Sequence, residues 1–74
     1  MKYNWNVNEI SACAGTDCVL WAFRGGHWVV YRYGAVAARG QADVERWRTD
    51  PMTSAKLAAE AAFEELQKRE GNDQ

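Results

Sequence analysis

The sequence predicts a small α+β protein, in which a three- to four-stranded antiparallel meander sheet packs one face against a single C-terminal amphipathic helix. Two observations lead to this prediction. Residues 1–40 contain short alternating or continuously apolar segments separated by glycine turns, whereas residues 51–69 repeat their apolar residues at spacings of three and four. The first pattern is typical of strands in hairpins and the second of a helix with one buried face. A chain of 74 residues has room for one core, so we expect residues 1–74 to form a single domain.

The first strand is expected over about residues 3–9, because Tyr3, Trp5 and Val7 alternate there with polar residues. The segment that follows, residues 11–17 (SACAGTD), is rich in small turn-forming residues and predicts a loop.

Two cysteines lie in or beside this loop, Cys13 and Cys18. We expect both to be free thiols in a reducing cytosol, and a disulfide across the short loop is the alternative. A zinc site needs about four ligands, and only His27 offers a third, so we expect no metal.

The central hairpin is the clearest local feature of the sequence. Residues 18–24 (CVLWAFR) and 27–33 (HWVVYRY) are rich in β-forming residues and flank Gly25-Gly26, a pair suited to a two-residue turn. A further strand is expected over residues 35–40 after Gly34. Residues 41–48 either extend that strand or form a connection that Trp47 anchors to the core.

The helix is predicted over about residues 51–69, with Asp50 as N-cap and Pro51 at its first position, and Thr53 or Ser54 is the alternative cap. Residues 71–74 are expected to fray. Its apolar face is expected to carry Met52, Ala55, Ala59, Ala62, Phe63 and Leu66. Its solvated face is expected to carry the row Lys56, Glu60, Glu64 and Lys68.

One helix covers only one face of such a sheet, yet both faces of the central hairpin are apolar. One of two sets of side chains must then point away from the helix. In residues 18–24 the two sets are Val19, Trp21 and Phe23 against Cys18, Leu20 and Ala22, and in residues 27–33 they are Trp28 and Val30 against His27, Val29, Tyr31 and Tyr33. An uncovered apolar face indicates a contact surface. The alternative is that the first strand and the 41–49 connection fold over it.

The charge pattern argues against a general attraction to nucleic acid or to anionic membranes, because the net charge is −1. Residues 1–40 carry a net charge of +2 and residues 41–74 a net charge of −3. No segment has the length of apolar sequence that a membrane span or a signal peptide requires. We therefore expect a cytoplasmic protein.

Catalytic patterns are missing from the sequence. His27 is the single histidine, and no phosphate-binding glycine motif occurs. The glutamates Glu60, Glu64 and Glu65 of the predicted helix have lysines nearby, as on a solvated face. We expect no enzyme activity, no catalytic residues and no cofactor.

Residues 27–40 (HWVVYRYGAVAARG) followed by 53–66 (TSAKLAAEAAFEEL) resemble the C-terminal part of a double-stranded RNA-binding domain in the order of their elements. That resemblance implies a helix N-terminus that grips phosphates. The matching positions, residues 53–56, contain one lysine where that family has a basic cluster, and the family's N-terminal helix has no counterpart.

The short length, the sheet-then-helix layout and the acidic helix half also resemble small α+β proteins encoded by phages and mobile elements, anti-CRISPR proteins among them. This resemblance implies inhibition or redirection of a host protein complex.

We therefore expect a protein-interaction module whose partner is a host protein or a second copy of the chain. The candidate contacts are the sheet aromatics and the acidic helix residues Trp21, Trp28, Tyr31, Tyr33, Glu60, Glu64 and Glu65. The alternative is a single-stranded nucleic-acid-binding protein, in which strand aromatics stack on bases beside Arg24, Arg32 and Arg39.

Overall fold

The computed structural model describes residues 3–72, with side chains described for residues 3–69, and contains a five-stranded antiparallel sheet followed by two α-helices. Each strand pairs with the next along the chain, so the α+β class and the meander are confirmed. The strands are β1 (Trp5–Val7), β2 (Ser11–Ala14), β3 (Leu20–Phe23), β4 (His27–Arg32) and β5 (Ala35–Gln41). A short turn, η1 (Thr16–Cys18), joins β2 to β3, and the helices are α1 (Val44–Trp47) and α2 (Pro51–Asn72).

The sheet has five strands rather than three or four because residues 11–14, predicted as a loop, form β2. Ala12 and Ala14 are buried on the helix-facing side of the sheet, where they pair with Ala22 and Leu20 of β3. The first strand is correspondingly shorter than residues 3–9. Asn8 ends it by accepting hydrogen bonds at Oδ1 from the backbone N–H groups of residues 10 and 11 (3.1 and 2.9 Å).

The turns at the two ends of β4 differ from each other. Between β3 and β4 the Gly26 N–H donates to the Phe23 carbonyl, and Gly26 has a φ of 97°. The loop is therefore residues 24–26 rather than the predicted Gly25-Gly26 pair alone. Between β4 and β5, Tyr33 and Gly34 both have positive φ and form a two-residue turn between the paired residues Arg32 and Ala35.

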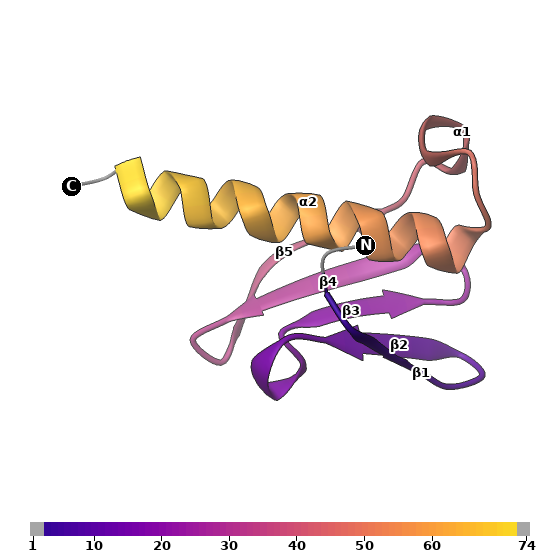
Figure 1. Cartoon of the computed structure of the whole chain (residues 1–74), viewed down its shortest axis with the longest axis horizontal. Helices are drawn as coiled ribbons and strands as arrows, with labels where there is room; N and C mark the ends of the chain where they lie inside the picture. The colour runs from indigo at the N-terminus through magenta and orange to yellow at the C-terminus, as the bar shows by residue number, and fades with distance from the viewer. Residues whose placement is uncertain (1–2, 73–74) are drawn as a thin grey trace.

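Helix α2 packs its small side chains against the sheet, and both helices lie on the same side of it (Figure 1). Ala55 and Ala59 are completely buried, which lets the helix approach β3 and β4 closely. Larger side chains fill the space around this contact, namely Trp5, Leu20, Trp28, Val30, Phe63 and Leu66. The apolar face predicted for the helix is thus the buried one.

Both helices begin at aspartate caps. Asp50 accepts a hydrogen bond from the Thr53 backbone N–H at Oδ2 (2.9 Å) and one from the Thr53 hydroxyl at Oδ1 (2.7 Å). Asp43 caps α1 by accepting at Oδ1 from the N–H groups of Glu45 and Arg46 (3.0 and 3.3 Å). The ambiguous residues 41–48 therefore form the end of β5 and then α1, which contacts α2.

Helix α2 extends past the predicted limit of residue 69 to Asn72. Of the tail predicted to fray, residues 71 and 72 belong to this helix, and residues 73–74 lie outside the described part of the chain. Among residues 3–72, no helix has the length and apolar character needed to cross a membrane.

Candidate functional site

The face of the sheet that points away from α2 is lined by apolar and aromatic side chains. We call it the open face and define it by Trp21, Phe23, Val29 and Tyr31 of β3 and β4. The alternation of the strands places these residues opposite Leu20, Ala22, Trp28 and Val30, which pack under the helix. Within residues 3–72 both helices lie on the other side (Figure 1), and the first strand pairs edge-on with β2. The alternative in which these segments fold over the open face is therefore wrong.

Three rings follow one another along the open face. Trp21 and Phe23 are stacked, with ring centroids 6.2 Å apart and an interplanar angle of 13°. His27, across the β3–β4 turn, lies with its ring centroid 5.9 Å from that of Phe23. The first contact lies within β3 and the second joins β3 to β4, and together they make a continuous aromatic surface.

At the end of the sheet that carries η1 and the β4–β5 turn, the open face is hollowed. This aromatic hollow has a volume of about 570 Å³ and is lined by Asp17, Val19, Trp21, Tyr31, Tyr33 and Gly34. Its walls come from η1, from β3 and β4 and from the β4–β5 turn. Three aromatic rings and one carboxylate thus meet at one place.

The turn that places Asp17 in this hollow has an unusual backbone. Gly15, Asp17 and Cys18 have φ values of 82°, 58° and 51°, in the left-handed region that most side chains avoid. A disulfide between Cys13 and Cys18, whose Cα atoms are 5.2 Å apart, closes the turn. The expectation of two free thiols is wrong, because β2 returns beside η1 and brings the two cysteines together.

Tyr33 occupies a position that favours other residues. With a φ of 54° it is the first residue of the two-residue β4–β5 turn, where asparagine, aspartate or glycine is preferred. Its side chain is 88% exposed, so its ring contributes little to the core. A bulky residue in a left-handed conformation with no core role points to a surface role.

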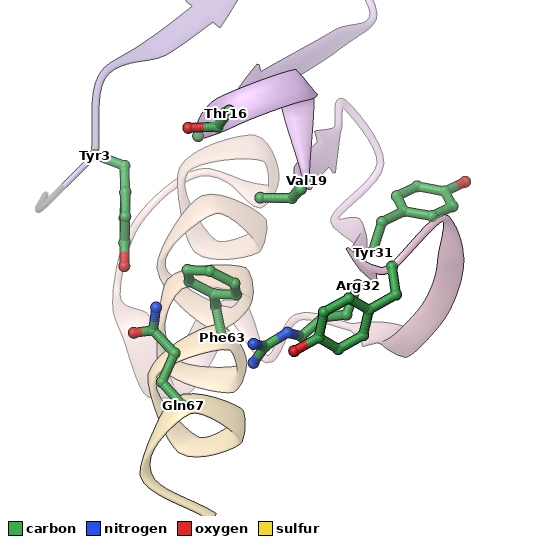
Figure 2. Close-up of a pocket in the computed structure, with 9 residues that line it drawn as sticks. Tyr3, Thr16, Val19, Tyr31, Arg32, Phe63 and Gln67 are labelled. Carbon is green, nitrogen blue, oxygen red and sulfur yellow. The ribbon is translucent and has the colours of Figure 1, made fainter. Parts of the chain in front are cut away.

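A second hollow of about 460 Å³ adjoins the first on the helix side and shares Val19, Tyr31 and Tyr33 with it. Figure 2 shows the Arg32 side chain extending toward Phe63 of α2, while Tyr31 points away from the helix. The Arg32 guanidinium carbon lies 5.5 Å from the centroid of the Phe63 ring and 5.4 Å from that of Tyr33. Arg32 therefore packs between the helix and the β4–β5 turn through cation–π contacts.

The predicted contact residues divide into two groups. Trp21, Tyr31 and Tyr33 come together around the aromatic hollow, and Tyr31 is 37% exposed. Trp28 instead packs against both groups of core residues beneath α2, and Gly40 of β5 makes room for its ring. We leave Trp28 out of the candidate site for this reason.

The acidic residues of the helix also differ from one another. Glu60 is only 6% exposed, and its Oε2 accepts hydrogen bonds from Trp5 Nε1 (2.8 Å) and the Tyr3 backbone N–H (3.3 Å). The prediction that Glu60 belongs to a solvated row is wrong, because Tyr3 and Trp5 lie over this part of α2. Glu64 is half-buried, and Glu65 is exposed and forms an ion pair with Arg69 (3.7 Å). These glutamates do not form one acidic patch.

Sequence reasoning did not select Asp17, Phe23 or Val29 as site residues. Phe23 and Val29 were recoverable from strand alternation once Trp21 and Tyr31 were chosen. Asp17 lies in a loop, and no sequence pattern links it to Tyr33 sixteen residues later.

Among the described residues, no group of three histidine, cysteine, aspartate or glutamate side chains is placed to hold a metal ion.

Comparison of the chain with models of known protein families, with characterised proteins and with solved structures found no match.

Proposed function

We propose that the chain is a small protein-binding module whose contact surface is the open face together with the aromatic hollow. The observation that carries this proposal is the position of Trp21, Phe23, Val29 and Tyr31 on the face of the sheet that neither helix covers. Aromatic side chains are enriched at the energetic centres of protein interfaces. A rigid five-stranded sheet holds them in place before binding, which reduces the entropy lost on association.

The ring stack and the carboxylate of Asp17 support a protein partner over an extended nucleic acid. Trp21 and Phe23 stack on each other, so part of each ring face is already in contact with the other ring. Asp17, at the end of the face, places a negative charge where a phosphate backbone would be repelled. A protein surface with apolar and basic side chains matches this arrangement.

Site-specific photo-crosslinking in the organism that encodes the chain tests the proposal. A benzophenone amino acid replaces Tyr31 in one variant, and it replaces Lys68, exposed on α2, in the matched control. We expect Tyr31 to give one reproducible crosslinked protein, identified by mass spectrometry, and Lys68 to give none. Adding Val29→Glu at the centre of the open face should abolish the product, because it places a charge in the interface.

Two outcomes would overturn this assignment. Crosslinks from Lys68 alone would move the contact to the acidic helix, and equal crosslinks from both positions would indicate nonspecific proximity. A product of twice the chain mass would identify a second copy as the partner, and light scattering at several concentrations would then give the strength of the dimer. Inhibition of the partner, which the resemblance to mobile-element proteins implies, is assayed once that partner is identified.

A second candidate function is single-stranded nucleic-acid binding on the same face. Arg39 of β5 is paired in register with Val29, and the exposed Arg24 follows Phe23, so two cations lie near the ring stack. Binding of a labelled mixed-sequence oligonucleotide should then weaken steeply between about 50 and 200 mM salt. Arg39→Gln should weaken it further. Absence of salt-dependent binding would exclude this function.

A further inference from the structure

We propose that the aromatic hollow binds an arginine side chain that the partner protein presents. This inference rests on the proposed function and specifies the chemistry of the partner. It begins from the lining of the hollow, where the rings of Trp21, Tyr31 and Tyr33 lie around one carboxylate, that of Asp17. Among the described lining residues, Asp17 is the one that carries a charge at neutral pH.

Aromatic faces attract cations, and the attraction is strongest for cations that lose little hydration. The guanidinium of arginine is planar and weakly hydrated, and it stacks on aromatic rings while donating paired hydrogen bonds to a carboxylate. The ammonium of lysine is compact and strongly hydrated, so it gains less from the same surroundings. The combination of three rings and one carboxylate therefore favours arginine over lysine.

The molecule already makes this kind of contact with its own arginines. The Arg32 guanidinium lies over the ring of Tyr33, itself a wall of the hollow, and Arg46 lies 5.1 Å from the ring centroid of Trp47. Tyr33 is 88% exposed, so most of its ring is accessible in addition to the part that faces Arg32.

The size of the hollow fits a side chain delivered by a polypeptide. A volume of about 570 Å³ lies within the range of small-ligand sites, and one guanidinium group would fill only part of it. The neighbouring residues of an extended partner segment would occupy the rest and continue along the open face over Val29 and Phe23.

The positive charges of the sheet limit the affinity but do not line the hollow. Arg39 is paired with Val29, and Arg32 extends to the helix side of the β4–β5 turn. A single capped arginine should therefore bind weakly, with a Kd on the order of 1 mM. The rest of the partner interface would supply the remaining affinity.

Titrations of the isotope-labelled full chain, followed by nuclear magnetic resonance, test the inference. The three probes are N-acetyl-arginine amide, N-acetyl-lysine amide and N-acetyl-citrulline amide, the last being a neutral analogue of nearly the same shape as arginine. We expect arginine alone to shift the Trp21 indole N–H and the backbone signals of Asp17, Tyr31 and Gly34. Equal shifts with citrulline, or equal or larger shifts with lysine, would overturn the proposal.

Two variants then locate the bound arginine. Asp17→Asn keeps a residue that tolerates the left-handed backbone but removes the charge, and it should weaken arginine binding about two- to fivefold. Tyr33→Asn removes one ring of the hollow, so it should weaken arginine binding. Because asparagine is preferred at that turn position, the fold should stay at least as stable. Glu45→Gln, at an exposed acidic residue of α1, is the matched control and should change nothing. Unchanged binding in both hollow variants would place the arginine elsewhere and overturn the proposal.

This inference and the proposed function can fail separately. If arginine does not bind but crosslinking from Tyr31 persists, the open face is a protein contact that does not use arginine, and the inference alone is wrong. If crosslinking from Tyr31 is also absent, the proposed function is wrong as well.

Discussion

The indole N–H of Trp5 donates a hydrogen bond of 2.8 Å to Oε2 of Glu60, and this contact joins the edge strand β1 to helix α2. The same oxygen accepts the Tyr3 backbone N–H at 3.3 Å, and the Glu60 side chain is almost fully buried. A buried carboxylate of this kind needs such donors to offset the loss of hydration.

Replacing Glu60 with alanine should lower the free energy of unfolding by about 2–3 kcal/mol, because it leaves donors of Trp5 and Tyr3 without their acceptor. Glu60→Gln keeps an acceptor oxygen and should cost about 1 kcal/mol. Chemical denaturation of both variants measures the effect. Glu65→Ala, at an exposed glutamate of the same helix, is the control and should cost less than about 0.5 kcal/mol. Equal losses for Glu60→Ala and Glu65→Ala would contradict a structural role for Glu60.

The case of Glu60 shows where sequence periodicity is insufficient. The spacing of Glu60 and Glu64 matches a solvated row, and the buried row of Ala55, Ala59 and Phe63 was predicted from the same helical period. Periodicity gives the direction in which a side chain points from the helix axis. It does not reveal that Trp5, 55 residues earlier, covers the side of the helix on which Glu60 lies. Contacts between distant segments of this kind need the tertiary structure.

Strand β2 and the aromatic hollow escaped prediction for related reasons. Residues 11–14 (SACA) contain small side chains that match loop composition, yet they pair with β3 and bury Ala12 and Ala14 on the helix-facing side of the sheet. The hollow depends on the conformation of η1, which the disulfide and several positive φ values set. In contrast, the central strands and the apolar face of α2 follow from their own periods, and the alternation of side chains within β3 and within β4 was predicted. Which faces of the two strands share a side depends on the register that places Trp21 opposite Val29.

Trp28 and Gly40 provide a test of packing on the helix-facing side of the sheet. A methyl group added at Gly40 would lie 2.9 Å from Cζ2 of the Trp28 ring, closer than carbon atoms pack. Gly40→Ala should therefore lower the free energy of unfolding by about 1–3 kcal/mol, as measured by thermal or chemical denaturation. Gly25→Ala, where no heavy atom lies within 4 Å of the added carbon, is the matched control. A Gly40→Ala variant as stable as Gly25→Ala would show that the Trp28 ring moves freely.

The cap of α2 should make stability depend on pH in acid. Hydrogen bonds from the Thr53 backbone N–H and from its hydroxyl hold the pKa of Asp50 below its usual value of 3.8. The charged form thus stabilises the folded state. This contribution is fully present above the pKa of the unfolded chain and is lost as the pH falls through the lower pKa of the folded chain.

Asp50→Asn keeps a capping side chain that does not titrate, so it serves as the comparison. We expect the stability advantage of the natural chain over Asp50→Asn to be constant near neutral pH and to decrease below about pH 4. Denaturation curves across this pH range measure the difference. A difference that does not change with pH would indicate that the Asp50 charge does not contribute to the cap.

The disulfide between Cys13 and Cys18 should stabilise both the fold and the aromatic hollow. It closes a short loop in the unfolded chain, so replacing both cysteines with alanine should lower the free energy of unfolding by about 2 kcal/mol. Cys13 of β2 is paired with Trp21 in the sheet, and Cys18 follows Asp17, so the bond joins the η1 wall of the hollow to the strand beside Trp21. We expect its loss to weaken binding of N-acetyl-arginine amide as well.

Reduction separates the effect of the bond from the effect of the substitutions. Dithiothreitol should weaken arginine binding and lower the stability of the natural chain, but it should leave the double-alanine variant unchanged. Iodoacetamide should modify the natural chain only after reduction, because both sulfur atoms are joined in the folded protein. Alkylation of both cysteines without reductant would show that the thiols are free. In that case Gly15 and the pairing of β2 with β3 would have to hold Asp17 in the hollow.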